Sequence, residues 1–243
     1  YADDILIMTR NKTSLEAIIH SLEKRAKNYG MQINQTKTSY IGMHIPPGTD
    51  PPTYRDHTEA APKHILHVDS FKYLGVTISE SASQLKHVSS KLAHASKEFN
   101  KLHQFWRHAN LTPKFRVSVF KSIFDPMITY GLHHSHLPIP LESRIDAFQN
   151  RKLRRVLHIK SSHLPKELGG HISNKEVLAR AKCIPLSDSI LHRQMIYYGH
   201  LARHPETTEN KVVFQGKNER ILIGKRRVGR PRHHWLPNIE KHI

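Results

Sequence analysis

The spacing of apolar residues changes along the chain from strand-like to helix-like. Short strands are expected at residues 5–8, 31–33, 39–43 and 71–78. From Leu85 to Leu201 the apolar residues recur in steps of three and four, which predicts amphipathic helices. This order predicts an α+β fold with its strands in the first 79 residues.

Capping signals set the expected helix boundaries. Residues 13–16 and 173–176 have the pattern of a capping box, and Thr112 with Pro113 is typical of a helix start. Gly30 is predicted to end the first helix. The expected helices cover residues 13–29, 85–106, 113–127, 143–157, 174–181 and a stretch from residue 186 onward. The proline-rich stretch 44–64 favours a loop.

The net charge of the chain indicates the class of molecule that it binds. The 243 residues include 38 Lys and Arg against 20 Asp and Glu, a formal net charge of +18. Such an excess favours a polyanionic partner, RNA or DNA, through counterion release and long-range steering. A basic scaffold without a nucleic-acid role stays open as an alternative.

The composition indicates the cellular compartment of the protein and whether it contacts a membrane. No apolar run approaches the roughly 18 residues of a membrane span, so we expect no membrane partner. The single cysteine, Cys183, excludes an intrachain disulfide and indicates an intracellular, reducing compartment. The basic run 225–232 is also typical of a nuclear-localisation signal. The sequence gives no indication of oligomeric state.

A pair of carboxylates opens the chain. Asp3 and Asp4 lie directly before the apolar run 5–8 and repel one another unless a cation neutralises them. Carboxylate oxygens are ligands that Mg²⁺ prefers, as in two-metal nucleotidyl transfer. Two aspartates before an apolar run are also typical of an ordinary turn before a strand.

Two further segments carry candidate chemistry. Lys37 follows a turn at Asn34 and could stabilise or protonate a departing pyrophosphate, although spacing alone fits a solvated lysine better. Phe71, Lys72, Tyr73, Leu74 and Gly75 place aromatic rings around a lysine and a glycine, which suits a hairpin that contacts a nucleic-acid backbone. An ordinary core strand is the alternative for this segment.

Basic residues cluster in two later stretches. The residues expected to contact phosphate are Arg151, Lys152, Arg154, Arg155, Arg226, Arg227, Arg230 and Arg232. A solvated charged face is the alternative reading for both stretches. Trp235 either stacks on a base or anchors the C-terminal residues on the body.

The order of these motifs resembles the reverse transcriptases of non-LTR (LINE-type) retrotransposons. YADD at 1–4 is followed by GMQINQTKT at 30–38 and FKYLG at 71–75, similar to the last three blocks of a reverse-transcriptase palm. Later segments extend the resemblance over nearly the whole chain: ITYG at 128–131, FQNRKLRRVL at 148–157, YGHLAR at 198–203 and GRPRHHW at 229–235.

The resemblance implies roles for these residues. Asp3 would bind metal with support from Asp4, the cofactor being Mg²⁺, and Tyr1 would lie near the incoming nucleotide and the template-primer. Lys37 would serve the dNTP triphosphate, and residues 71–75 would form the primer grip. The implied domains are a partial palm at 1–79, a helical thumb at 80–165 and a helical, basic C-terminal region at 166–243. The partners would be an RNA template and a DNA primer or target.

The resemblance also implies that the chain is a fragment. The family's earlier palm carboxylate, fingers and endonuclease are not found in these residues. We therefore expect RNA-directed DNA polymerase activity in a longer parent and none from this chain alone. The alternative is a nucleic-acid-binding module without catalysis, domesticated or degenerate.

Overall fold

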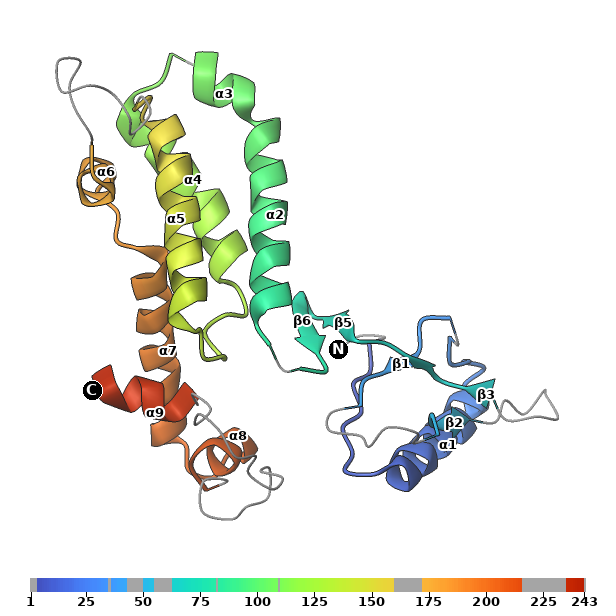
Figure 1. Ribbon diagram of the computed structural model, residues 1–243. Coiled ribbons are helices and arrows are strands. Elements are labelled where there is room, and N and C mark those ends of the chain that lie inside the picture. The colour runs from blue at the N-terminus through green and yellow to red at the C-terminus, as the bar shows by residue number, and fades with distance from the viewer. Residues whose placement is uncertain are drawn as a thin grey trace. The chain divides into compact units, whose positions relative to one another are not determined.

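The computed structural model describes residues 4–34, 36–42, 50–54, 63–81, 83–108, 110–159, 172–215 and 235–242. It has the mixed α+β composition expected from the sequence, with short strands confined to the first 79 residues and helices dominating thereafter. The chain divides into two compact units, residues 1–87 and 88–243 (Figure 1). The three-domain division stays a prediction.

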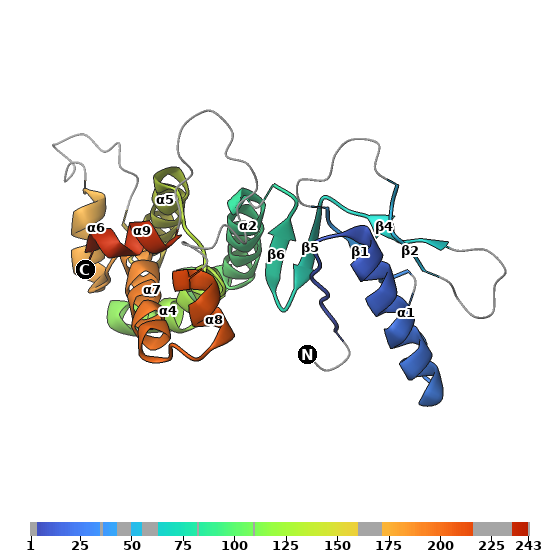
Figure 2. The ribbon, with the colours of Figure 1, turned by 90° about the horizontal axis from the view of Figure 1, so that it is seen from below.

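In its described residues the first unit has helix α1, the start of a second helix, and three small sheets. Helix α1 covers Lys12–Asn28. Strands β1 (Ser39–Tyr40) and β4 (Leu66–His67) pair in parallel, β2 (Thr53–Tyr54) and β3 (Lys63–His64) pair antiparallel, and β5 (Ser70–Tyr73) and β6 (Val76–Ser79) form a hairpin (Figure 2).

Helix α1 begins and ends at polar signals. Its N-cap is Asn11, whose side chain accepts a hydrogen bond from Ser14 N. The helix therefore begins earlier in the chain than the capping box at residues 13–16 predicted. The predicted end at Gly30 is confirmed. Gly30 has φ +69°, and the amides of Gly30 and Met31 bond back to Lys27 and Ala26.

Three of the predicted strands require correction. Residues 31–33 form no strand, because the Met31 amide is used to close the end of α1. Residues 5–8 also form no strand, although Ile7 packs against an apolar cluster. The strand predicted at 71–78 is divided by a turn at Leu74 and Gly75.

The second unit is a helical assembly built around α5. The helices are α2 (Leu85–Lys101), which begins in the first unit, α3 (His103–His108), α4 (Pro113–Thr129), α5 (Ile139–Val156), α6 (Asn174–Ala181), α7 (Leu186–Arg203), α8 (Thr208–Asn210) and α9 (Trp235–Ile239). A π-helical segment, Lys211–Gln215, follows α8, and a 3₁₀ turn, Glu240–His242, follows α9. Helix α5 contacts α4, α6 and α7, and α4 and α5 run side by side (Figure 1).

Aromatic rings fill the core between α2, α3 and α4. Phe99 stacks on Trp106 with ring centroids 5.0 Å apart and planes 12° apart. Phe120 and Phe124 pack against Phe99 from α4. The Trp106 indole N–H donates to the Phe99 carbonyl at 3.1 Å. The same carbonyl also accepts the Leu102 amide at 3.2 Å, a tighter turn at which the single helix predicted over 85–106 is interrupted.

Side chains of α5 hold the start of α7. Pro185 precedes α7 and has no capping side chain. Asp146 accepts from the amide and hydroxyl of Ser187, and Gln149 accepts from the amide of Leu186. These bonds satisfy helix-start amides that would otherwise lack partners.

A lysine is buried in this core. Lys152 of α5 is 4% exposed, and its ammonium group donates to Ser96 Oγ at 3.0 Å. The same group lies over the rings of Phe99 and Phe148, at 4.5 and 5.3 Å from their centroids. Burial, together with the charges of Arg151 and Arg155, lowers the pKa of Lys152 to about 8.

We expect Phe124→Ala to destabilise the second unit by about 3–5 kcal/mol, because it leaves a cavity in the aromatic core. Phe124 is fully buried, whereas Phe115 on the same helix is 51% exposed. The control Phe115→Ala should cost less than about 1 kcal/mol. Urea unfolding followed by circular dichroism measures both, and equal losses would contradict the assigned core.

We expect Lys152→Met to raise the free energy of unfolding at pH 7 by about 1 kcal/mol or more, because it removes a desolvated charge. Between the lowered folded pKa and the ordinary unfolded value, from about 8 to 10.5, the unfolded chain binds more protons. Stability of the unmodified protein therefore rises with pH across this window. Urea unfolding should show that the Met variant gains less free energy of unfolding over the unmodified protein at pH 10 than at pH 7. The exposed control Lys175→Met should show no such trend.

Candidate functional site

The carboxylate segment is described from Asp4 onward. Tyr1 and Asp3 lie outside the described residues. Asp4 is exposed, and Ile7, three residues later, packs against the apolar cluster of Ile19 and Ile65. The Asp4 side chain is thus accessible to a cation.

Lys37 extends from a turn built by Asn34. The Asn34 side chain accepts from Lys37 N at 3.1 Å and from the Thr36 hydroxyl at 2.8 Å, and the Asn34 carbonyl accepts from Thr38 N at 3.0 Å. The turn predicted at Asn34 is confirmed, and the Lys37 side chain is exposed. Asparagine favours such turns because its side chain bonds its own backbone.

One apolar cluster supports both segments. Ile7, close to Asp4, and Ile33, next to Asn34, both pack against Ile19 and Ile65. Two stretches that carry candidate catalytic groups therefore rest on the same small core of the first unit.

The hairpin formed by β5 and β6 carries the predicted residues 71–75. Phe71 pairs with Ile78 and Lys72 with Thr77, and Phe71 and Tyr73 are half-buried while Lys72 is exposed. Leu74 and Gly75 form the turn with φ of +46° and +79°, as in a type I′ turn. Leucine is strained in this conformation, yet the side chain is 42% exposed.

A buried histidine fixes the hairpin, and sequence reasoning missed it. His87 is 1% exposed, and its Nδ1 accepts the Thr77 amide at 3.1 Å. Thr77 pairs with Lys72, so this bond also fixes the strand that presents the lysine. The signal was weak, because His87 is one of 21 scattered histidines.

The basic residues of α5 occupy different environments. Arg151 and Arg155 are exposed, whereas Lys152 is buried as described above. Arg154 is half-buried and donates to the Ile172 carbonyl at 2.7 Å and to the Asn174 side chain at 2.9 Å. Of these four predicted phosphate contacts, Arg151 and Arg155 are therefore the ones exposed to a ligand.

The C-terminal arginines Arg226, Arg227, Arg230 and Arg232 lie outside the described residues. Trp235 is described, and its indole N–H donates to the His133 carbonyl at 3.2 Å while its ring packs on Tyr197. The interpretation of Trp235 as an anchor on the body is confirmed.

The part of the chain that the structure describes lacks two further features. Within it, no three His, Cys, Asp or Glu side chains form a group able to hold a metal ion. No described helix combines the length and apolar character needed to cross a bilayer.

The chain is similar to proteins of mobile elements. Residues 1–78 match the family described as reverse transcriptase (RNA-dependent DNA polymerase). An RNA-directed DNA polymerase from the Drosophila melanogaster mobile element jockey is 24% identical over 98% of this chain. The chain spans 26% of the length of that polymerase.

A second relative is shorter. An uncharacterized transposon-derived protein of Caenorhabditis elegans is 23% identical over 100% of this chain, which covers 84% of that relative. No solved structure matches the chain. The two relatives and the match over residues 1–78 confirm that this chain resembles the reverse transcriptases of LINE-type mobile elements.

Proposed function

We propose that this chain is part of an RNA-directed DNA polymerase of a non-LTR retrotransposon, which copies an RNA template from a DNA primer with dNTPs. The observation that carries the proposal is the reverse-transcriptase match over residues 1–78, which include the aspartate pair, Lys37 and the β5–β6 hairpin. Residues 1–79 would be the partial palm, 80–165 the thumb and 166–243 a basic C-terminal region.

The aspartates are the proposed metal ligands. Adjacent carboxylates provide hard oxygen donors, which fit Mg²⁺, and Asp4 is exposed to solvent. When bound, the metal would neutralise charge on the triphosphate and activate the primer hydroxyl. Asp3 is the proposed direct ligand, and Asp4 supports it.

Lys37 and the hairpin would position the substrates. The Asn34 turn holds the Lys37 backbone while leaving its ammonium group exposed, which suits contact with an anionic triphosphate. Exposed Lys72 would contact a primer phosphate, and Leu74 at the tip of the hairpin would pack on the primer sugar.

A second function is a nucleic-acid-binding module without catalysis. The observation that favours it is the pair of exposed arginines on α5 in a chain of net charge +18. In this reading the exposed arginines Arg151 and Arg155 would contact phosphates, and binding would weaken steeply with salt.

Primer extension on a primed RNA template tests the polymerase proposal. In the longer polymerase that we propose, Asp3→Ala should lower extension by about 1,000-fold or more, because transition-state charge loses its stabilisation. The control Asp50→Ala removes an equal charge at an exposed residue and should leave extension unchanged.

Equal extension by these two variants would contradict the catalytic assignment. We expect residues 1–243 alone to give no extension. If the longer polymerase is also inactive but the chain binds nucleic acid with a steep salt dependence, the binding module replaces the polymerase.

The substitution Leu74→Asn should affect the stability of the hairpin and its proposed role in primer extension in opposite directions. Asparagine tolerates a positive φ, so stability of the first unit should rise by about 1 kcal/mol. Extension by the longer polymerase should nevertheless fall, because the apolar contact at the hairpin tip is lost. Urea unfolding and primer extension measure the two effects, and unchanged extension would remove Leu74 from the proposed grip.

A further inference from the structure

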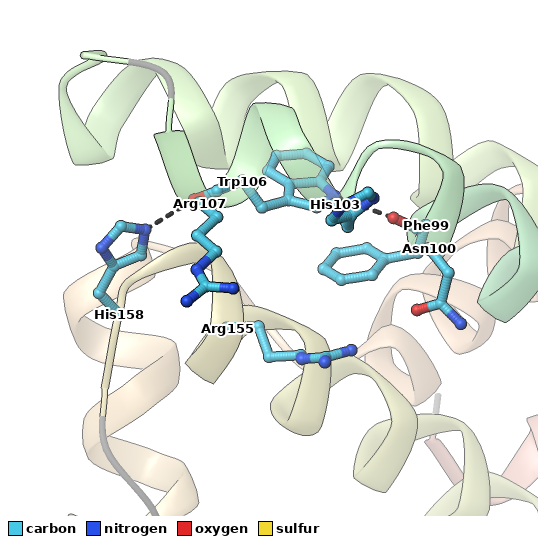
Figure 3. Close-up of a pocket in the computed structure, with 7 residues that line it drawn as sticks. All are labelled: Phe99, Asn100, His103, Trp106, Arg107, Arg155 and His158. Atoms are coloured by element: carbon cyan, nitrogen blue, oxygen red, sulfur yellow. Dashed lines mark hydrogen bonds between the residues drawn. The ribbon is translucent and has the colours of Figure 1, made fainter.

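A pocket of about 650 Å³ lies in the second unit where α2, α3 and the end of α5 meet (Figure 3). It is lined by Phe99, Asn100, His103, Trp106, Arg107, Arg155 and His158. A volume of this size is typical of small-ligand sites. Only Arg155 among these residues was expected from the sequence to contact nucleic acid.

The aromatic rings that line the pocket are held by contacts with each other and are buried. Phe99 and Trp106 stack on each other, and the Trp106 indole N–H is already bonded to the Phe99 carbonyl. These side chains are 2% and 4% exposed, so neither ring offers a free face to a base. A ligand would therefore be recognised by its polar groups and not by base stacking.

The polar side chains around this lining include two arginines. The Arg107 side chain extends from α3 toward α5, where Arg155 lies (Figure 3). Both are exposed, and neither guanidinium makes a hydrogen bond or an ion pair with another described residue. Among the seven lining residues there is no carboxylate. Glu98, next to Phe99 in sequence, is paired with Lys101 at 2.8 Å.

Two further contacts shape the pocket. His158 Nε2 lies 2.7 Å from the Trp106 carbonyl and also contacts the Arg116 guanidinium group, so it links the end of α5 to α3 and α4. The buried ammonium group of Lys152 lies 4.5 Å from the centroid of the Phe99 ring and adds positive charge near the pocket. The walls are thus held together although the two arginines repel one another.

We propose that this pocket binds the phosphate group of a polynucleotide strand between Arg107 and Arg155, without reading the base. Guanidinium groups match the geometry of phosphate oxygens and form strong charge-assisted bonds with them. His103 and Asn100 are exposed in the same pocket and can supply further donors. The test of this site does not require polymerase activity.

The side-chain indole signal of Trp106 reports on the pocket. The chain has two tryptophans, so a ¹⁵N spectrum contains two indole signals, and Trp235→Phe identifies the one from Trp106. Inorganic phosphate, compared with chloride at equal ionic strength, and a short single-stranded oligothymidine without a terminal phosphate should each shift that signal. A shift with phosphate alone would assign the pocket to a free phosphate group and not to a strand.

Arginine variants complete the test. Arg107→Gln and Arg155→Gln should each weaken both titrations about tenfold, whereas Arg144→Gln, an exposed arginine of α5 outside the pocket, should not. Circular dichroism checks that the variants fold. The proposal is overturned if neither probe moves the Trp106 signal, or if all three variants weaken binding equally.

Discussion

The stacked pair of Phe99 and Trp106 is the contact on which the second unit depends. The Trp106 indole N–H donates to the Phe99 carbonyl, so the contact that forms the core also ties α3 back onto the end of α2 across the turn at Leu102. Phe120 and Phe124 bring α4 onto these rings, and such aromatic clusters dominate the energetics of small cores. The Lys152 ammonium group then lies over the Phe99 ring, so α5 is tied to the same cluster.

The presence of the helices could be predicted from the sequence, because apolar residues that recur every three or four positions form one apolar stripe along a helix. The Thr112 cap of α4 and the Ser173 cap of α6 were both readable, since each depends on residues three positions apart. Boundaries set by tertiary contacts were not readable. The amide of Ser187 at the start of α7 is satisfied by Asp146, 41 residues earlier, and no local pattern contains that information.

The residues of the candidate site also divide into those whose conformation local sequence predicts and those for which it does not. The Asn34 turn was predictable because an asparagine bonds its own backbone locally. The turn at Leu74 was not, because leucine rarely adopts a positive φ. For Lys152 the signal was present but misread: it lies four residues from Phe148 and from Val156, both of them buried, so its place on the apolar stripe could have been recognised.

Charge balance explains why the guanidinium groups of Arg107 and Arg155 lack ion-pair partners among the described residues. With 20 acidic against 38 basic residues, most cations cannot be paired, and carboxylates such as Glu98 and Glu176 already pair with Lys101 and Arg180. Two arginines facing one pocket repel each other and so lower the stability of the free protein. A phosphate placed between them would turn that repulsion into two attractions. The energy that the free fold loses there is therefore available as binding energy for an anion.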